Sequence, residues 1–228
     1  MDSSQAPILD KLMKAWRFFY KRGFIEGFGH ISARAPSPEQ IFITRHSLGI
    51  ETSPEDFLLF DLKGRQIAGK GSPPGEIPIH LEVYKHRPDV GSVFHFHGLY
   101  ATAFTTSRHT LQPCYFLASI FKDGIPVHPD SRLISDGERG AALARTLGRC
   151  RAALLKAHGV VVTGADIEEM VAGAFILEDN AHRAWVSAAM GDPIWLESKV
   201  MAEVDEELVR TRGPFRRIWA LCESEAGE

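Results

Sequence analysis

The sequence predicts an α/β sandwich, in which helices pack on the faces of a mixed, largely antiparallel sheet. Stretches with helical spacing of apolar residues, such as 8–20, alternate along the chain with short runs rich in β-branched and aromatic residues. Glycine turns join several of these runs, which is typical of antiparallel neighbours. With 228 residues, 24% of them charged, the chain is expected to form one globular domain over 1–228.

The first part of the chain is expected to supply two helices and most of the strands. Apolar spacing over 8–20 predicts an amphipathic helix that stops near Gly23, and spacing over 76–86 predicts a second helix that ends before Pro88. A loop over 69–75 precedes the second helix. The expected strands, with their glycine turns, cover residues 27–34, 40–44, 57–61, 65–68 and 93–98.

The second part of the chain is expected to be richer in helices. Ser135 and Glu138 have the spacing of a capping box, so a helix should begin there and end at Gly148. Gly213-Pro214 should break the helical pattern and leave one last short apolar-faced turn or helix. The other expected helices cover 99–106, 166–190 and 196–209, and the expected strands cover 120–127, 152–156 and 160–163.

Charge and cysteine content exclude several classes of partner. A formal net charge of −3 with scattered basic residues favours neither nucleic acid nor an anionic membrane as partner. No apolar run approaches the ~20 residues of a membrane span, and the N-terminus lacks the basic start and apolar core of a signal peptide. Three cysteines without metal-type spacing suit a reducing compartment. We therefore expect a cytoplasmic protein that acts on a small molecule.

Two histidines lie two residues apart in the apolar run 93–98. Side chains of an extended strand alternate between faces, so His95 and His97 should share one face and leave Phe94 and Phe96 on the other. A pair of neutral imidazoles in apolar surroundings needs hydrogen-bond partners or a cation. Both a bound divalent ion such as zinc and satisfaction by backbone carbonyls remain open on this evidence.

Two further residues could complete a metal site. His158 precedes Gly159 at a strand end, where the backbone can come close to a bound ion, although a hydrogen-bonded strand-end histidine is the simpler alternative. Glu76 opens a helix, where a carboxylate could merely favour the helix dipole. Together with His95 and His97, these residues give a complete tetrahedral set, and a carboxylate that detaches could act as a general base.

These residues closely resemble the class II aldolase/adducin family, from about Ile8 to Pro193. The resemblance implies an α/β/α sandwich that holds a zinc or manganese ion on His95, His97 and His158. It also implies that Glu76 is both the fourth ligand and the acid/base. The motifs that carry it are Gly29-x-Ile31-Ser32, Glu76-x-x-x-His80, His95-x-His97-Gly98 and Ala157-His158-Gly159.

The resemblance further implies a cyclic homotetramer with its sites between subunits. Aldolases of the family borrow a tyrosine from the neighbouring subunit, and counting back from Ile125-Pro126 places Tyr115 at that position. Simple core packing of Tyr115, beside Cys114 and Phe116, is the alternative.

The chain departs from the family's sugar-phosphate members where those members hold phosphate. They place Asn after the first Gly, a Thr-Gly step in the second turn and two serines before the catalytic Glu. Here His30 follows Gly29, the second turn is altered, and Pro74-Gly75 precede Glu76. Proline offers no N–H and glycine no hydroxyl, so donors to phosphate are lost.

A carboxylate or phenolate is therefore the expected substrate group. An arginine fork suits a planar anion, although Arg45 and His46 could instead form a solvated turn. Family members with a Gly-His-Ile-Ser-like motif include decarboxylases of hydroxylated aromatic or pyridine dicarboxylates. The residues expected to bind substrate are His30, Ser32, Arg45, His46 and Ser47.

The expected activity is that of a metal-dependent carbon–carbon lyase that works through a metal-stabilised enolate. Decarboxylation is favoured over aldol cleavage; Glu76 would protonate carbon in the first reaction and take a proton in the second. An adducin-like binding module is a rival, but it would not need three histidines and a glutamate. A non-haem iron oxygenase is a second rival, since Fe²⁺ also uses two histidines and a carboxylate.

Overall fold

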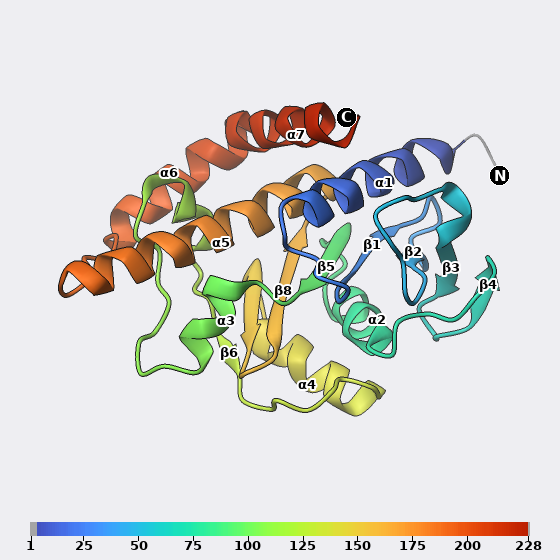
Figure 1. Cartoon of the computed structure of the whole chain (residues 1–228), viewed down its shortest axis with the longest axis horizontal. Coiled ribbons are helices and arrows are strands. Elements are labelled where there is room, and N and C mark those ends of the chain that lie inside the picture. Colours follow the sequence, from blue (N-terminus) through green and yellow to red (C-terminus); the bar gives the residue numbers. More distant parts are fainter. Residues whose placement is uncertain (1–3, 228) are drawn as a thin grey trace.

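The core of the molecule is an eight-stranded sheet with strand order β4-β3-β2-β1-β5-β8-β7-β6. The structure is a computed structural model that describes residues 4–227 (Figure 1). All neighbouring strands pair antiparallel except β6 and β7, which are parallel. Helices cover both faces of this sheet (Figure 1). The predicted sandwich with a mixed, largely antiparallel sheet is therefore confirmed.

Strands from distant parts of the sequence meet in the middle of the sheet. β5 lies between β1 and β8, and the β1–β5 register places His30 directly opposite His95. This pairing brings the Gly-His-Ile-Ser segment to the histidine strand. The strands are β1 His30–Arg34, β2 Gln40–Thr44, β3 Phe57–Asp61, β4 Gln66–Ala68, β5 Ser92–Phe96, β6 Val127–His128, β7 Ala152–Leu155 and β8 Gly159–Gly164.

Each face of the sheet has its own apolar core. One core joins the sheet to α1, α5 and α7, and the other joins it to α2 and α4 (Figure 1). The helices are α1 Ala6–Lys21, α2 Ile77–His86, α3 Leu99–Thr105, α4 Gly137–Leu147, α5 Ile167–Met190, α6 Ser198–Thr211 and α7 Gly213–Ala226, with 3₁₀ turns η1 Pro54–Asp56 and η2 Phe116–Phe121. None of the helices in residues 4–227 is long and apolar enough to cross a bilayer.

β5 contributes to both cores because its side chains alternate. Phe94 and Phe96 enter the core under α1 and α5, where the Phe94 ring stacks on that of Phe19 at a centroid distance of 4.1 Å. Val93 enters the opposite core, beneath α2 and α4. His95 therefore faces the α2 layer, in which Glu76 lies.

Two local predictions are wrong. Residues 120–127 do not form a strand, because η2 occupies 116–121 and only Val127–His128 pair with β7. Asp136, not Ser135, caps α4, since its carboxylate accepts the backbone N–H of Arg139 at 2.9 Å. The predicted break near Gly213-Pro214 is present, because α6 ends at Thr211 and Arg212 adopts a left-handed conformation before α7, which at 14 residues is longer than the short element expected.

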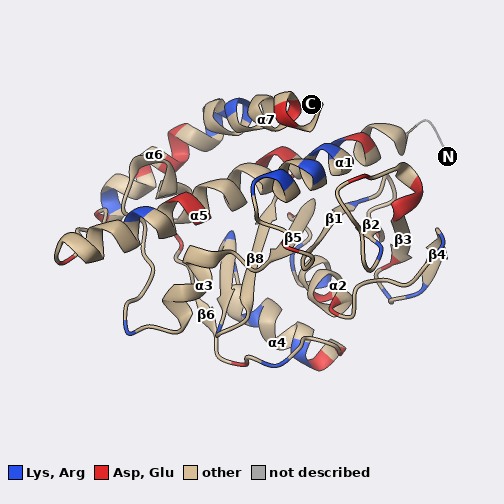
Figure 2. Cartoon of the chain, in the orientation of Figure 1, with Lys and Arg blue, Asp and Glu red and all other residues tan. Residues whose placement is uncertain are grey.

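Acidic and basic residues are mixed on the same elements. Figure 2 shows both signs of charge on α1, α4 and α7. This mixture agrees with the scattered basic residues seen in the sequence.

Replacing Phe94 with alanine should lower the free energy of unfolding by about 3–5 kcal/mol. Its ring is fully buried and packs against Phe19 and Phe96, so the substitution leaves a cavity. Chemical denaturation measures the change. The matched control is Phe28→Ala, at a side chain that is 69% exposed and should cost about 1 kcal/mol or less. Equal losses in the two variants would contradict the burial argument.

Candidate active site

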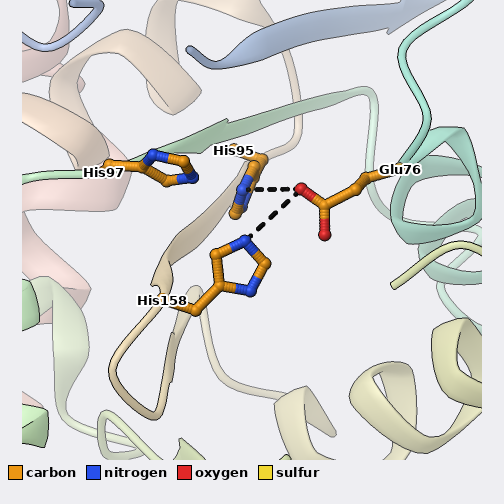
Figure 3. A group of neighbouring side chains, drawn as sticks. All are labelled: Glu76, His95, His97 and His158. Carbon is orange, nitrogen blue, oxygen red and sulfur yellow. Dashed lines mark ion pairs between the residues drawn. The ribbon is translucent and has the colours of Figure 1, made fainter. Parts of the chain in front are cut away.

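Four side chains from distant parts of the chain converge at one end of the sheet. Glu76 Oε2 lies 3.4 Å from His95 Nε2 and 3.4 Å from His158 Nε2 (Figure 3). One ligand atom from each of Glu76, His95, His97 and His158 lies within 4.8 Å of all the others. The structure thus brings together all four residues that the sequence singled out as metal ligands.

Strand ends and turns position the four side chains. His95 lies in β5, Glu76 is the residue before α2, and His158 lies in the turn between β7 and β8. β5 ends at Phe96, so His97 lies one residue beyond the strand on which it was predicted. Its ring nevertheless lies close to that of His95, with centroids 5.2 Å apart.

Gly159 lets the His158 turn approach β5. A Cβ at this position would lie 2.7 Å from Cδ2 of His97 and 2.7 Å from the carbonyl oxygen of Phe96. Both distances are shorter than any normal carbon contact, and the backbone carbonyl cannot move without disturbing β5. Only glycine therefore allows His158 to stand beside His95 and His97.

Glu178 of α5 holds the chain just after His97, and the sequence analysis missed it. Its carboxylate accepts the backbone N–H groups of Tyr100 at 2.6 Å and Ala101 at 3.1 Å. A Cβ on Gly98 would collide with this carboxylate. Burial raises the pKa of Glu178. Its one signal in the sequence is an acidic residue after an apolar run of the long helix.

The site combines an ionised carboxylate with the neutral imidazoles of His95 and His97. Burial raises the pKa of Glu76, but the imidazoles of His158, His30 and His95 around the carboxylate outweigh burial and hold this pKa well below its usual range. The Oε1 atom also accepts the backbone N–H of Ile134 at 2.9 Å. Burial lowers the pKa of His95 and of His97 to about 4. These are the protonation states that bind a divalent cation at neutral pH.

The hydrogen bonding of His95 fits a metal ligand. Its Nδ1 lies 3.0 Å from the carbonyl oxygen of Val160, so Nδ1 carries the proton and donates it. Nε2 then presents a lone pair toward Glu76 Oε2, and this buried atom has no hydrogen-bond partner among the described residues. Two lone pairs facing each other are unfavourable unless a cation lies between them. The residues present therefore fit a divalent metal ion held by three histidines and a glutamate.

His30 and Ser32 lie on the α2 face of β1, beside the metal ligands. His30 Nε2 lies 3.9 Å from Glu76 Oε2, and the His30 and His95 ring centroids are 4.9 Å apart. Ser32 is fully buried, and its hydroxyl already contacts His80 and Tyr84. Burial lowers the pKa of His30 and lowers that of His80 well below its usual value. His30 thus borders the site directly, whereas Ser32 lies behind it.

The other predicted substrate residues lie in the turn after β2. Arg45 Nε donates to Asp56 at 2.6 Å, and Ser47 Oγ contacts His46 Nδ1 at 2.7 Å. The backbone N–H of His46 donates to the carbonyl of Ser72 at 2.8 Å, which ties this turn to the segment before Glu76. No hydrogen bond or ion pair within residues 4–227 joins the three side chains to the metal ligands, so their contact with substrate stays a prediction.

Tyr115 packs on the opposite face of the sheet from the metal ligands. Its side chain is partly buried and packs against the core under α1 and α5. The Arg183 guanidinium lies 4.7 Å from the Tyr115 ring centroid. Within one chain its contacts are those of core packing. A role in the site of a neighbouring subunit stays a prediction.

The fold and the four converging side chains define a class of protein. Three imidazoles and one carboxylate at the end of a sheet form the kind of site in which enzymes hold a divalent ion. The model of the Class II Aldolase and Adducin N-terminal domain matches residues 10–185, and the chain belongs to this family. It is a metal-dependent lyase of the class II aldolase superfamily. The resemblance seen in the sequence is confirmed.

Related proteins of known name carry different activities. The chain is 30% identical over 181 residues to an L-fuculose phosphate aldolase of Methanococcus maripaludis, covering 78% of this chain and 96% of the aldolase. It is 27% identical over 190 residues to a 3,4-dihydroxyphthalate decarboxylase of Terrabacter sp., covering 78% of this chain and 80% of the decarboxylase. The family is therefore fixed, while relatives differ in the bond they cleave.

A solved structure shares the fold over nearly the whole chain. An aldolase II superfamily protein from Pseudomonas syringae superposes with a TM-score of 0.86, covering 99% of this chain and 94% of that chain, at 21% identity. This likeness confirms the predicted α/β architecture.

Removing two histidines should abolish metal binding. A His95→Ala, His97→Ala double variant keeps only half of the ligand set, so purified protein should lose stoichiometric divalent metal in elemental analysis. His86→Ala is the control, because His86 is exposed at the end of α2. Unchanged metal content in the double variant would refute the site.

A methyl group at residue 159 should weaken metal binding by about tenfold or more, as do other changes that misplace ligands. The added Cβ must displace either the His97 ring or the β5 backbone. Competition with a coloured chelator gives the affinity of Gly159→Ala. Gly49→Ala is the matched control, because a Cβ there meets no atom within 4 Å. Equal affinities in both variants would show that close approach at residue 159 is unimportant.

Proposed function

We propose that this lyase decarboxylates a hydroxylated aromatic or pyridine dicarboxylate. The observation that carries the proposal is the imidazole of His30, whose Nε2 lies 3.9 Å from the Glu76 carboxylate. His30 takes the place of the asparagine that sugar-phosphate members use for phosphate, and Pro74-Gly75 replace their two serines. The similarity to a 3,4-dihydroxyphthalate decarboxylase supports the same substrate class.

The turn after β2 supplies the remaining groups for a flat, carboxylated ring. Arg45, His46 and Ser47 lie together there, and the turn is tied to Ser72 just before Glu76. We assign these three side chains to the ring carboxylate that does not leave, because an arginine fork matches a planar anion.

Glu76 moves the proton in the proposed reaction. A divalent ion, when bound, supplies Lewis acidity that stabilises negative charge on the substrate oxygens. Glu76 is ionised and held at Oε1 by the Ile134 N–H, so Oε2 is the atom that would bind the ion and, once detached from it, accept a proton from the substrate hydroxyl. The carbon–carboxylate bond breaks, carbon dioxide leaves, and the electron pair of the broken bond stays on the ring carbon. Glu76 then returns the proton to that carbon.

Aldol cleavage of a hydroxy-carbonyl or sugar-phosphate substrate is the second candidate. An ionised Glu76 can take the hydroxyl proton that retro-aldol cleavage requires. The L-fuculose phosphate aldolase that is 30% identical to this chain favours it. A non-haem iron oxygenase is a third candidate, because the same donor set accepts Fe²⁺ as well as Zn²⁺ or Mn²⁺.

We also propose a cytoplasmic homotetramer in which Tyr115 reaches the site of a neighbouring subunit. Large apolar side chains stand exposed on α3 and α5, including Leu99, Trp185 and Met190 at 74%, 54% and 84% exposure. Exposed apolar groups of this size favour association. The three cysteines are free, which suits a reducing compartment.

Protein loaded with Zn²⁺, with Mn²⁺ or, by anaerobic loading, with Fe²⁺ should release carbon dioxide from hydroxylated aromatic dicarboxylates such as 3,4-dihydroxyphthalate. Glu76→Gln should keep its fold and lower turnover about 10²–10⁴-fold, because the proton carrier is lost. Glu39→Gln, at an exposed position, is the matched control.

The same assay separates the three candidates. Fuculose phosphate and ribulose phosphate are tested in parallel, and oxygen consumption is followed. Cleavage of a sugar phosphate without any decarboxylation would establish the aldolase, and oxygen uptake coupled to turnover would establish the oxygenase. Full activity of Glu76→Gln would remove Glu76 from the mechanism.

A further inference from the structure

A buried chain of polar groups runs from the active site into the interior between β1 and α2. His30 Nδ1 lies 2.6 Å from His80 Nε2, and His80 Nδ1 lies 2.6 Å from Ser32 Oγ. Ser32 Oγ in turn lies 2.9 Å from the hydroxyl oxygen of Tyr84. His80, Ser32 and Tyr84 are at most 1% exposed, and His30 is 6% exposed. Water therefore cannot replace the hydrogen-bond partners of His80, Ser32 and Tyr84.

Two repeating patterns build the chain. His30 and Ser32 lie two residues apart on one face of β1, and His80 and Tyr84 lie one turn apart on α2. Glu76 lies one turn before His80 on the same side of the helix. The helix face and the strand face meet, so each polar group finds one partner on the other element.

The negative charge of Glu76 beside His30 favours one direction of hydrogen bonding along this chain. The contact between His30 and His80 has room for one proton between two ring nitrogens. If His30 Nδ1 carried that proton, His30 Nε2 would turn a lone pair toward the ionised carboxylate of Glu76, 3.9 Å away. An N–H group is attracted to a carboxylate, whereas a nitrogen lone pair is repelled by it. The proton on His30 therefore lies at Nε2, and His30 Nδ1 accepts from His80.

The remaining bonds follow from this choice. His80 donates from Nε2, so its Nδ1 accepts the hydroxyl proton of Ser32. Ser32 Oγ then accepts the hydroxyl proton of Tyr84. Ser32 is the hydroxyl in contact with His80 Nδ1, and by donating there it stabilises His80 in this tautomer.

We infer that His30 presents a fixed Nε2–H group to an anionic oxygen of the substrate, and that His80, Ser32 and Tyr84 are positioning residues that hold this tautomer. The inference deepens the proposed function and rests on it only in requiring an oxyanion beside the metal ligands. It gives Ser32 a role behind His30 in place of direct substrate contact.

The tautomer is measured directly by ¹⁵N NMR of zinc-loaded protein labelled in histidine, with resonances assigned by single replacement. His30 should carry its proton on Nε2 in the unmodified protein and in Tyr84→Phe. In Ser32→Ala, His80 loses the donor at Nδ1, so the preference for Nε2 should weaken and part of the His30 population should carry its proton on Nδ1. Ser92→Ala is the matched control, since its buried hydroxyl bonds the Ser32 carbonyl and not the chain. A proton on His30 Nδ1 in the unmodified protein, or no change in Ser32→Ala, would overturn the inference.

Binding of oxalate tests the donor itself without any turnover. Oxalate is a planar dianion that presents carboxylate oxygens to a divalent ion. Calorimetry on zinc-loaded protein should show affinity reduced about tenfold or more in Ser32→Ala, as expected for a lost hydrogen bond to a charged group, and unchanged in Ser92→Ala. Equal affinity in Ser32→Ala and the unmodified protein would overturn the donor role. Absence of decarboxylation with both results intact would instead count against the proposed reaction alone.

Discussion

The buried carboxylate of Glu76 is the constraint on which the site depends. An anion this far from water is costly unless neighbouring groups stabilise it. The protein supplies the Ile134 N–H at Oε1, whereas His95 Nε2 turns a lone pair toward Oε2, so the charge there needs a cation. Removing one partner of a buried charge costs more than its share of the attraction, because the other charge is left uncompensated. The carboxylate and its surroundings are therefore one unit, and a divalent ion completes it.

The same strand builds the core and the site. Because side chains of β5 alternate, Phe94 and Phe96 anchor the strand under α1 and α5, while His95 points to the α2 layer. The tight packing of the phenylalanines fixes the position of the His95 backbone, and the hydrogen bond to the Val160 carbonyl fixes the orientation of the His95 ring. The position of His95 is thus set by a well-packed core. His97 lies beyond the strand and depends on the turn that Glu178 holds.

The comparisons separate what is constant in the family from what varies. A TM-score of 0.86 at 21% identity shows that the fold tolerates wide sequence change. Relatives nonetheless include an aldolase and a decarboxylase, so membership of the family alone does not determine the reaction. His30 on β1, the turn after β2, and Pro74-Gly75 before Glu76 surround the metal ligands. In the proposed function these groups select the substrate.

The sequence by itself determined the sandwich, most helix and strand positions, and the four ligands, because apolar periodicity and short motifs are local in the chain. It misjudged the α4 cap, where Ser135 and Asp136 are neighbouring candidates, and a strand over 120–127, most of which is a 3₁₀ turn or loop. The pairing of His30 with His95, the Ile134 and Glu178 contacts, and the chain through His80, Ser32 and Tyr84 join residues far apart in sequence. The spacing of His30 and Ser32 and that of His80 and Tyr84 can both be read from the sequence. Only the register of β1 on β5 and the packing of α2 on the sheet bring the two pairs into contact.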